Sequence, residues 1–563
     1  MKIYKKLIVL SGLILSLTAF AKVKFVQSPP LSSFVNKSIQ ACGQQSTIQV
    51  PLITWGGDIA TIYANGNVTK TAKGSIFANK GLNFKLVRED IFSKQVENLL
   101  TCKSPFIRGT VGMVNLAKDV TDRDPRTKLK VIYQMTWSAG GDALVVKSGI
   151  KSAKDLKGKT IAVQAYGPHV DYLAKVLSNA GLTIKDVTIK WTQDLTGTQN
   201  TPVEAFRDPS IHAALVIIPD GLALTTNGTV GSGAEDSVKG ARILLSTKTA
   251  NRVIADVYAV RSDYFKANRT QVQKFVSGLL KAQEEVAPIM RNEKSAPYSS
   301  LLTSSAEILL DSPNLKADAK GMYLDAEFVG YPGNEKFFTV ATYPRNLKKL
   351  SNEVQTAFIG LGLLTSKSPI AWAGWNFKNL KAGLTQTVAK TTPKFDTQKV
   401  QQMVTAKIAT KSLDADVLFA IDAFFAPRQS SVPVNAYKKQ FNKIIDLATT
   451  NGGALLTVEG HADPTHYQRR VEANALTVEL NRIRQATKNL SVSRANDFRD
   501  ALIKYAKSKG VTIDPSQIVT VGHGVSSPRF ARPQDKKQWN ANRRVEFRMV
   551  NVEAESDVFV PFN

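Results

Sequence analysis

The feature that most constrains the fold is a regular exchange of strand-like and helix-like segments before residue 385. The runs Thr47–Thr54 and Asn83–Arg88 have strand patterns, whereas Ile91–Leu100 and Val170–Ala180 have helical spacing. Further strand-like runs follow at Leu129–Gln134, Ala143–Lys147, Thr160–Val163, Val187–Trp191 and Ala213–Ile218. Strands separated by helices are typical of α/β proteins, so we expect an α/β chain with mainly parallel sheets.

The N-terminus has the pattern of a secretory signal peptide. Lysines at positions 2, 5 and 6 precede the apolar run Leu7–Leu17, and Ala19-Phe20-Ala21 supplies small residues for cleavage. The run is short for a membrane span, although an uncleaved anchor is the alternative. No cysteine follows the cleavage site, so we expect no lipid anchor. Residues 1–21 should therefore direct export, and no other run is long and apolar enough to span a membrane.

The chain has two cysteines, Cys42 and Cys102, and both follow the signal segment. Export to an oxidising compartment favours a disulfide between them over two buried thiols. Neither cysteine has a histidine or cysteine neighbour at metal-ligand spacing. We therefore expect a disulfide and no zinc site at these positions.

The chain is long and basic, with 563 residues and a formal net charge of +28. Such a length supports several domains. Most of the positive excess lies between the signal segment and residue 415. With an export signal and no nucleic-acid motif, anionic envelope polymers or an anionic small ligand are the expected partners, although many of the lysines could simply be solvated.

Three motifs stand in the last quarter of the chain. Gly460-His461-Ala462-Asp463 would end a strand with a carboxylate, Leu490–Ala495 would begin a helix with an arginine, and Asn542–Glu546 would begin a strand with paired arginines. One acid and one guanidinium in a pocket suit a ligand that carries both an ammonium and a carboxylate group.

These motifs, together with Val417–Asp422 and Val519–Gly524, resemble the OmpA-like C-terminal domain over about residues 414–551. The resemblance implies a small α/β domain, assigned to residues 414–563, that binds the diaminopimelate of peptidoglycan. Its motif positions are Asp463 and Arg494, with Arg543 supporting the pocket. The alternative is that Arg494 pairs with a local carboxylate.

The chain departs from that family between Asp463 and Arg494, where 494 − 463 = 31 positions is about double the usual separation. The added part, residues 467–488, is charged and amphipathic, so we expect an extra or lengthened helix. Thr487 also stands where the family has an asparagine.

A second resemblance rests on Gly140–Val163, His212–Asp220 and Ala255–Arg261. These segments look like the lobe-crossing region of type II periplasmic solute-binding proteins, close to the nitrate/taurine/thiamine-precursor group. The resemblance covers about residues 46–385. It implies a two-lobed α/β fold over residues 22–385, with a second lobe at about 142–253, that closes on a solute by hinge motion.

Three loops between strands and helices should line the cleft between the lobes. Their candidate ligand-binding residues are Thr54, Trp55, Gly57, Asp58, Ser138, Gly141, Asp142, Tyr166, Gly167 and His169. Free N–H groups at a helix start and the basic charge favour an anionic solute, whereas Asp58 and Asp142 would favour an amine. The alternative is that these are ordinary turns and that Trp55 and Tyr166 pack between the lobes.

Residues 386–413 are rich in Thr, Lys and Gln and read as a linker between the receptor and the wall-binding domain. The five histidines form no visible catalytic or metal-binding arrangement, although His461 and His466 flank Asp463. We therefore expect no enzyme, no cofactor, no metal and no nucleic-acid partner. The chain has no P-loop, so a separate membrane transporter would have to power uptake. A structural envelope protein that binds a protein partner is the alternative function.

Overall fold

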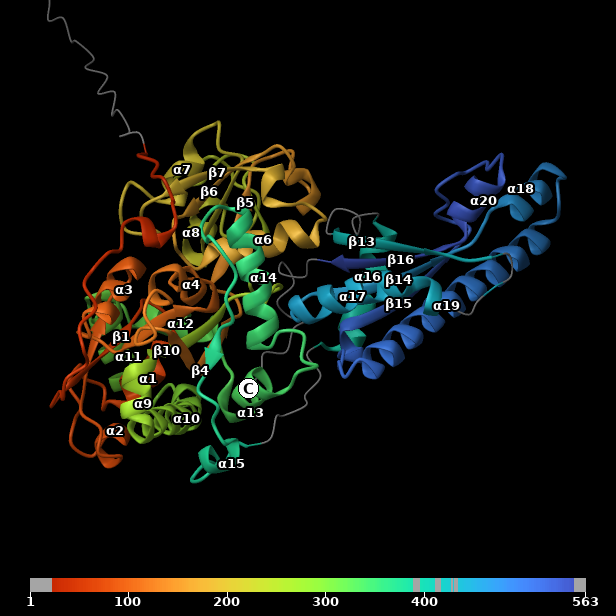
Figure 1. Cartoon of the computed structure of the whole chain (residues 1–563). Coiled ribbons are helices and arrows are strands. Elements are labelled where there is room, and N and C mark those ends of the chain that lie inside the picture. The colour runs from red at the N-terminus through yellow and green to blue at the C-terminus, as the bar shows by residue number, and fades with distance from the viewer. Residues whose placement is uncertain (1–22, 388–394, 411–416, 427–428, 430–433, 551–563) are drawn as a thin grey trace, which may run out of the picture.

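The computed structural model describes residues 23–387, 395–410, 417–426, 429 and 434–550 (Figure 1). The signal peptide expected at residues 1–21 lies outside these residues, as do parts of the expected linker. None of the helices in the described part of the chain is long and apolar enough to cross a membrane.

The first lobe holds two sheets. One is a parallel pair of strands, and the other has the order β11-β4-β10-β3 with β12 beside β4. Strand β4 is buried on both faces, so its apolar residues do not alternate with exposed polar ones, and its polar residues Gln134, Thr136 and Ser138 are buried as well. The strands are β1 (Ile48–Leu52), β2 (Phe84–Arg88), β3 (Phe106–Thr110), β4 (Leu129–Ser138), β10 (Ala255–Arg261), β11 (Ala326–Phe328) and β12 (Ala371–Trp372).

The second lobe holds a five-stranded sheet in the order β7-β6-β8-β5-β9. Strands β6, β7 and β8 are parallel, whereas β5 runs antiparallel to β8 and β9. The bounds are β5 (Asp142–Val146), β6 (Thr160–Gln164), β7 (Thr188–Thr192), β8 (Ala213–Ile217) and β9 (Arg242–Ser246).

The expectation of mainly parallel sheets is wrong, because the sheets are mixed. Strand β4 leads the chain out of the first lobe and β10 brings it back, so the two run in opposite directions and pair antiparallel. A chain that crosses twice between two lobes therefore places antiparallel strands in the middle of an α/β sheet. The alternation of helices and strands predicts the elements but not these directions.

Helices surround the sheets of both lobes and form much of the apolar core of each lobe. They are α1 (Asp58–Ala64), α2 (Ile76–Asn79), α3 (Phe92–Leu100), α4 (Val111–Leu116), α5 (Lys118–Thr121), α6 (His169–Asn179), α7 (Pro202–Arg207), α8 (Ile218–Leu224), α9 (Ser262–Ala267), α10 (Arg269–Arg291), α11 (Ala296–Leu310), α12 (Lys316–Leu324), α13 (Gly330–Thr339), α14 (Leu347–Gly360) and α15 (Phe377–Leu380). The helix expected at 170–180 is α6, which begins at His169.

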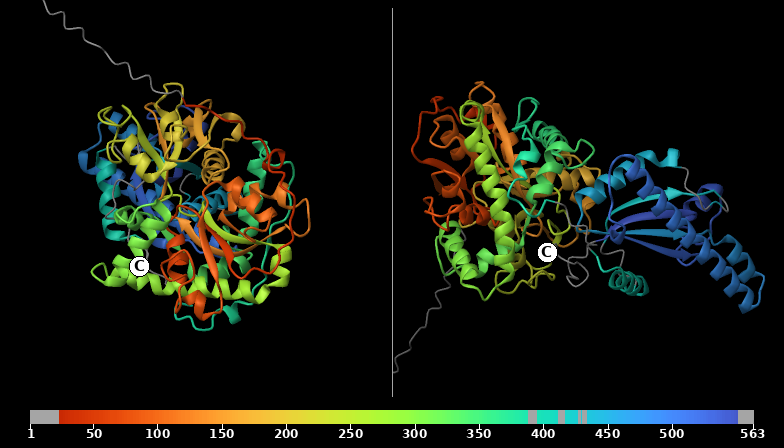
Figure 2. Two further views of the ribbon diagram at one scale, coloured as in Figure 1. Left: turned by 90° about the vertical axis from the view of Figure 1, so that its left-hand side faces the viewer. Right: turned by 90° about the horizontal axis from the view of Figure 1, so that it is seen from below.

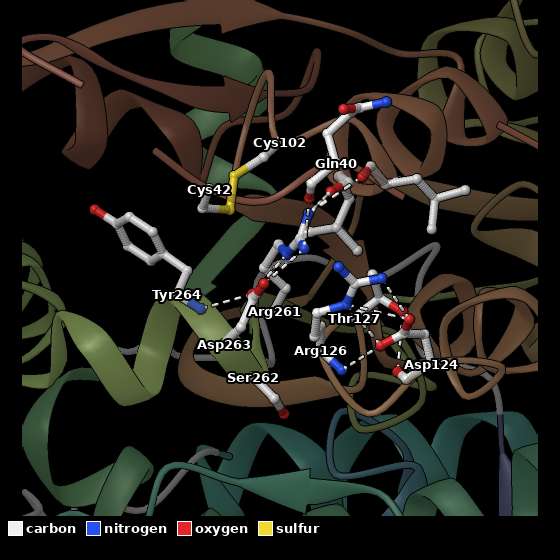
Figure 3. Close-up of polar contacts among 12 residues, drawn as sticks. Gln40, Cys42, Cys102, Asp124, Arg126, Thr127, Arg261, Ser262, Asp263 and Tyr264 are labelled. Atoms are coloured by element: carbon white, nitrogen blue, oxygen red, sulfur yellow. Dashed lines mark hydrogen bonds and ion pairs between the residues drawn. A yellow bond between two sulfur atoms is a disulfide. The ribbon is translucent and has the colours of Figure 1, made fainter. Parts of the chain in front are cut away.

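A disulfide joins Cys42 to Cys102, as the sequence predicts, with 5.3 Å between their Cα atoms. Beside it lies the buried guanidinium of Arg261, which donates to the carbonyl oxygens of Gln40 and Leu99 at 3.0 and 2.7 Å (Figure 3). Asp263 accepts two further hydrogen bonds from Arg261 at 2.7 Å. The disulfide and this arginine together fix the extended N-terminal segment to the first lobe.

The C-terminal domain is a four-stranded sheet in the order β13-β16-β14-β15. Helices α17 and α19 cover one face, where the rings of Phe441 and Phe498 meet edge to face at 5.2 Å. The bounds are β13 (Val417–Phe424), α17 (Lys438–Thr450), β14 (Leu455–His461), α18 (Thr465–Glu472), α19 (Thr477–Ser508), β15 (Ile518–Gly524), α20 (Lys536–Asn542) and β16 (Arg544–Val550).

The helical insertion expected at 467–488 is confirmed, because α18 and the first half of α19 occupy it. They project from the end of the domain that faces away from the receptor (Figures 1 and 2). The expected linker is in part a covering helix. α16 (Thr397–Ala409) packs Val400 and Val404 against Leu455 and Val519 on the second face of the sheet.

The C-terminal domain contacts the two-lobed N-terminal part beside its return crossing. Gly453 lies so close to that segment that a Cβ atom there would be 1.8 Å from the carbonyl oxygen of Lys248. The amide of Gly453 donates to Thr249 O at 3.2 Å, and Lys175 of α6 forms an ion pair with Asp446 of α17 at 2.8 Å. The domain therefore rests on the segment through which the chain leaves the second lobe (Figure 2).

Candidate functional site

Four buried side chains form a hydrogen-bonded network where the chain crosses between the lobes. The hydroxyl of Ser138 donates to Oδ2 of Asp142 at 2.6 Å, and Nε2 of His169 lies 2.7 Å from Oδ1 of the same carboxylate. Thr247, on the return crossing, accepts from the amide of Asp142 at 3.0 Å and contacts Ser138 Oγ at 2.8 Å. The network therefore ties both crossings to the start of α6.

This network does not have the order of a catalytic triad. Activation of a serine requires that its hydroxyl bond to the base, but Ser138 bonds to the carboxylate and the carboxylate bonds to His169. Nδ1 of His169 is buried and has no hydrogen-bond partner among the described residues. The arrangement suits recognition of a polar group better than nucleophilic chemistry.

A second buried network lies at the start of α1, around Arg108 of β3. Its guanidinium is 2.9 Å from Asp58 and 2.8 Å from Asp256, and all three side chains are buried. Burial alone would lower the pKa of Arg108, but the two carboxylates outweigh it and raise the pKa above its usual range. Asp58 is therefore held by an internal partner.

Two further acids lie near the crossing network. Burial and the neighbouring Asp142 raise the pKa of Asp325 to about 7. Burial and Glu204 raise the pKa of Asp220 to about 6, while His169 lowers it. Sequence reasoning identified Asp142 but missed Asp325, which reaches the site from the loop after α12, far along the chain and without a motif.

The predicted loops of the first lobe and the crossing are in direct contact. The indole of Trp55 lies against Gly141, where a Cβ atom would be 2.6 Å from the ring, and its Nε1 donates to Thr136 at 3.0 Å. Gly56 packs against the carbonyl of Met322 in the same way. Gly57 packs against Thr136 and Trp55. Trp55 therefore packs between the first lobe and the segment that crosses to the second lobe.

The remaining predicted residues point elsewhere. Tyr166 has a φ of +60° and donates its hydroxyl hydrogen to Pro29 O at 2.6 Å, so it contacts the N-terminal segment. Gly167 packs against the side chain of Gln164. Thr54 is exposed and donates to Asp90. The structure thus brings together Trp55, Ser138, Gly141, Asp142 and His169, and it does not bring Thr54, Tyr166 or Gly167 into the same network.

A cavity of about 520 Å³ lies between α6 and α14, away from the predicted loops. Its wall includes Asp171 and Lys175 of the second lobe and Glu353 of the first. Burial raises the pKa of Asp171 to about 8. Lys175 and Glu353 are 3.1 Å apart and close one part of this wall.

In the C-terminal domain, the three residues expected to bind peptidoglycan come together, with Asp463 and Arg543 at the ends of elements and Arg494 inside α19. The expectation that Leu490–Ala495 begins a helix is wrong, because the inserted segment extends this helix back to Thr477. Asp463, just after β14, accepts from Asn542 Nδ2 at 3.2 Å and from Thr465 N at 3.1 Å. Arg494 of α19 donates to the carbonyl oxygen of His461, two residues before Asp463, at 2.9 Å. Arg543 follows Asn542, and its charge is close enough to lower the pKa of Arg494.

Arg494 is buried, with 1% of its surface exposed, and among the described residues it forms no ion pair with a carboxylate. Its other donors reach the carbonyl oxygens of Gln429 at 2.9 Å and Ala426 at 3.5 Å. Burial and Arg543 lower its pKa to about 10. The side chain therefore remains charged at neutral pH, and among the described residues its charge is stabilised by carbonyl oxygens and by the ring of Phe425, 5.3 Å away, which makes it a candidate for an anionic ligand.

A polar row crosses the face of the sheet opposite α17 and α19. Glu546 pairs with Arg544 at 2.5 Å and also with Arg548, so its pKa falls to about 2 despite its burial. Glu459 lies beside His523 at 2.9 Å, and the ring of His523 stacks on His461. Burial, Arg544 and His523 lower the pKa of His461 to about 2, so this ring is neutral.

Residues 77–288 match the family model described as "NMT1/THI5 like". This segment includes the five-stranded sheet of the second lobe, and it does not extend into the C-terminal domain. The resemblance of the receptor part to the thiamine-precursor group of binding proteins is thereby supported over those residues. A comparison with curated proteins gives no match to this chain.

Among solved structures, the chain is similar to the alkanesulfonate-binding protein SsuA from Xanthomonas axonopodis pv. citri, with 14% identity, a TM-score of 0.40, and coverage of 57% of this chain and 96% of that chain. It is similar to the nitrate-binding protein NrtA from Synechocystis PCC 6803, with 13% identity, a TM-score of 0.38, and coverage of 58% of this chain and 84% of that chain. The chain is also similar to the desulfurization enzyme DSZB, with 15% identity, a TM-score of 0.36, and coverage of 60% of this chain and 98% of that chain. Likeness at this level does not indicate which ligand this chain binds.

Proposed function

We propose that this chain is an exported solute receptor that is held at the cell wall. The N-terminal part would bind a small solute between its lobes, and the C-terminal domain would bind peptidoglycan without a covalent bond. The export pattern, the matched segment at 77–288 and the Asp463–Arg494 site support this assignment. A periplasmic location and delivery of the solute to a membrane transporter follow from the same proposal.

The acids at the lobe junction carry the receptor half of the proposal. Asp142 and Asp325 are close enough to raise the pKa of Asp325, and Asp220 adds a third carboxyl group near His169. Two or three acids without a paired arginine favour a solute with an amino or ammonium group, because such a group would relieve their repulsion. Among the described residues, the cations near these acids are Arg108, which is already paired, and Lys248, which lowers the pKa of Asp325, so an anion would meet more acids than free cations here.

Calorimetry with the mature full-length chain tests the receptor half. Small primary amines and polyamines form one panel, and nitrate and alkanesulfonates form the other. Binding of an amine that is lost in Asp142→Asn and kept in Glu235→Gln, an exposed acid of the same lobe, would support the proposal. Binding of anions alone, unchanged in Asp142→Asn, would contradict it.

Arg494 carries the wall-binding half, because it is a buried cation that has no carboxylate partner among the described residues and donates to His461 O, two residues before Asp463. An ammonium group would pair with Asp463, and a carboxylate would pair with Arg494. In a pulldown with purified peptidoglycan, Asp463→Ala and Arg494→Ala should lose most of the bound protein. Arg499→Ala, which removes a partly exposed arginine of the same helix, should bind as the parent does.

One observation favours a second candidate, a structural envelope protein whose receptor-like part binds a protein. Trp55 fills the space beside Gly141, where a solute would otherwise approach the crossing network. If Trp55 blocks the junction permanently, no solute of either charge should change the melting temperature of the parent. Binding of an amine by the parent would exclude this second candidate.

A further inference from the structure

Three potential metal ligands converge on the face of the C-terminal sheet opposite α17 and α19. Glu459 and His461 are two residues apart on β14, so their side chains point to the same face, and β15 places His523 beside them. One ligand atom from each residue lies within 4.8 Å of the other two. The three residues are separated by up to 64 positions in the chain, so no sequence motif joins them.

His461 is the member that the protein itself leaves unsatisfied. Its side chain is 2% exposed, and neither Nδ1 nor Nε2 has a hydrogen-bond partner among the described residues. Buried polar atoms are almost always bonded, because an unpaired one costs about 1–3 kcal/mol. The ring stacks on His523, with 4.7 Å between centroids and 12° between planes.

Glu459 is oriented as a metal ligand would be. The hydroxyl of Thr457 donates to Oε1 at 2.8 Å, and Oε2 lies 2.9 Å from Nε2 of His523. A ligating carboxylate usually has such a neighbour, which fixes its orientation. Glu459 itself is 2% exposed.

The arginines beside the three residues are paired mainly with other acids. Glu546 pairs with Arg544 and Arg548, and Arg529 pairs with both Glu546 and Asp422. Arg548 also lies 3.7 Å from Oε1 of Glu459, so a metal ion would share that carboxylate with one arginine. Apart from Glu459, these three arginines share two acids, Glu546 and Asp422, so acids and arginines balance in this cluster only when Glu459 is included. An ion would therefore bind to one shared carboxylate and two imidazoles.

We propose that Glu459, His461 and His523 bind a divalent transition-metal ion, with Zn²⁺ the best match to the donor set. Two imidazole nitrogens and one carboxylate oxygen suit zinc, whereas Mg²⁺ and Ca²⁺ prefer oxygen ligands alone. The ligand atoms must approach to about 2.0–2.2 Å from the ion, which small rotations of the side chains supply. The main-chain oxygen of His461 also holds Arg494, so the ion would lie directly beneath the site proposed for peptidoglycan.

Calorimetric titration of the mature full-length chain with ZnCl₂ tests this proposal, using metal-stripped protein without a histidine tag. We expect one Zn²⁺ per chain and no binding of Mg²⁺. Glu459→Gln and His523→Ala should each weaken the affinity by about tenfold or more, since each removes one of three ligands. Zn²⁺ should also raise the melting temperature of the parent and not of these variants.

His466→Ala is the matched control, because His466 is exposed on α18 in the same domain and lies outside the three-residue cluster. It should bind Zn²⁺ as the parent does. Glu459→Gln preserves the size of the side chain, so it provides a test even where His461→Ala fails to fold. Absence of Zn²⁺ binding by the parent, or an unchanged affinity in both Glu459→Gln and His523→Ala, would overturn the proposal.

Discussion

Arg108 in the first lobe and Arg494 in the C-terminal domain are both buried arginines, but their surroundings differ. Arg108 lies between the carboxylates of Asp58 and Asp256, and every partner is internal. Arg494 contacts main-chain carbonyl oxygens, and among the described residues it has no carboxylate partner. The charge of Arg108 is balanced by two internal carboxylates, whereas the charge of Arg494 is stabilised by carbonyl oxygens and has no balancing negative charge among the described residues.

This difference separates residues that stabilise the fold from residues that are available to a ligand. A fully paired buried ion has little to gain from a further partner, and removing one member leaves an unpaired charge in the interior. An arginine held by carbonyl dipoles can still gain a charge-assisted hydrogen bond from an incoming carboxylate. We therefore assign Arg108 a structural role and Arg494 a binding role.

The largest expected effect comes from Arg108→Met, which leaves Asp58 and Asp256 buried without their counter-ion. We expect the receptor part to lose about 3–5 kcal/mol of unfolding free energy at pH 8. The loss should be smaller at pH 5, where the stranded carboxyl groups can take up protons. Urea denaturation followed by tryptophan fluorescence measures both values.

Arg494→Met provides the comparison, and it should cost the C-terminal domain about 1–2 kcal/mol, because it removes hydrogen bonds to carbonyl groups and no ion pair. An equal loss in the two variants would contradict the distinction between the arginines.

The next effect in size concerns the disulfide, which also distinguishes the two regions. Cys42→Ser combined with Cys102→Ser should reduce the stability of the receptor part by about 2–4 kcal/mol, since the bridge closes a loop of 60 residues. The chain has no other cysteine, so a reductant should leave the transition of the C-terminal domain unchanged. Differential scanning calorimetry with and without reductant resolves the two transitions.

A comparable effect is expected from Asp325, whose pKa of about 7 lies above its ordinary value of 3.8. Between these values the folded state keeps a proton that the unfolded state has released, so stability falls as pH rises. Asp325→Asn removes this loss. The difference of 7 − 3.8 = 3.2 pKa units sets an upper bound of about 4 kcal/mol on this loss, so Asp325→Asn should be about 2–4 kcal/mol more stable than the parent at pH 8 and match it near pH 4.

Glu546 of the C-terminal domain should behave in the opposite way, because its arginine partners lower its pKa to about 2. Its stabilising contribution is present at neutral pH and is lost only as pH falls toward 2. Denaturation of the parent, Asp325→Asn and Glu546→Gln at several pH values gives the difference in unfolding free energy between each variant and the parent. As pH rises, this difference should become more favourable for Asp325→Asn and less favourable for Glu546→Gln. A change in the same direction for both variants would contradict the assignment of Glu546 as a paired acid and Asp325 as an unpaired one.

The sequence predicts elements better than it predicts their partners. The periodicity of residues 170–180 predicts α6 within one residue, and the charged insertion at 467–488 is helical as expected. Strand direction could not be predicted, because it depends on the two crossings between lobes. The covering role of α16 was also missed, since Val400 and Val404 give only a weak apolar pattern in a polar segment.

For the sites, local motifs predict Asp142 beside Gly141, His169 at the start of α6 and Asp463 after β14. They also predict Arg494, although its motif lies inside α19 and not at a helix start. The sequence does not predict Asp325, Thr247, His523 or the pairing of Arg108. Each of these residues reaches its partners through tertiary contacts across 50 or more positions in the chain. The sequence predicts that Asp58 faces a ligand. In the structure it pairs internally with Arg108, and Arg108 belongs to no recognisable motif, so this pairing could not be predicted.

The most direct test of the binding role of Arg494 is calorimetry with two matched muropeptides, one containing diaminopimelate and the other lysine. The two differ in the side-chain carboxylate that Arg494 would hold, while both keep the amino group for Asp463. The account predicts saturable binding of the diaminopimelate muropeptide, a loss of at least about tenfold in affinity for the lysine form, and no such difference in Arg494→Met. Equal affinity of the parent chain for the two muropeptides would contradict it.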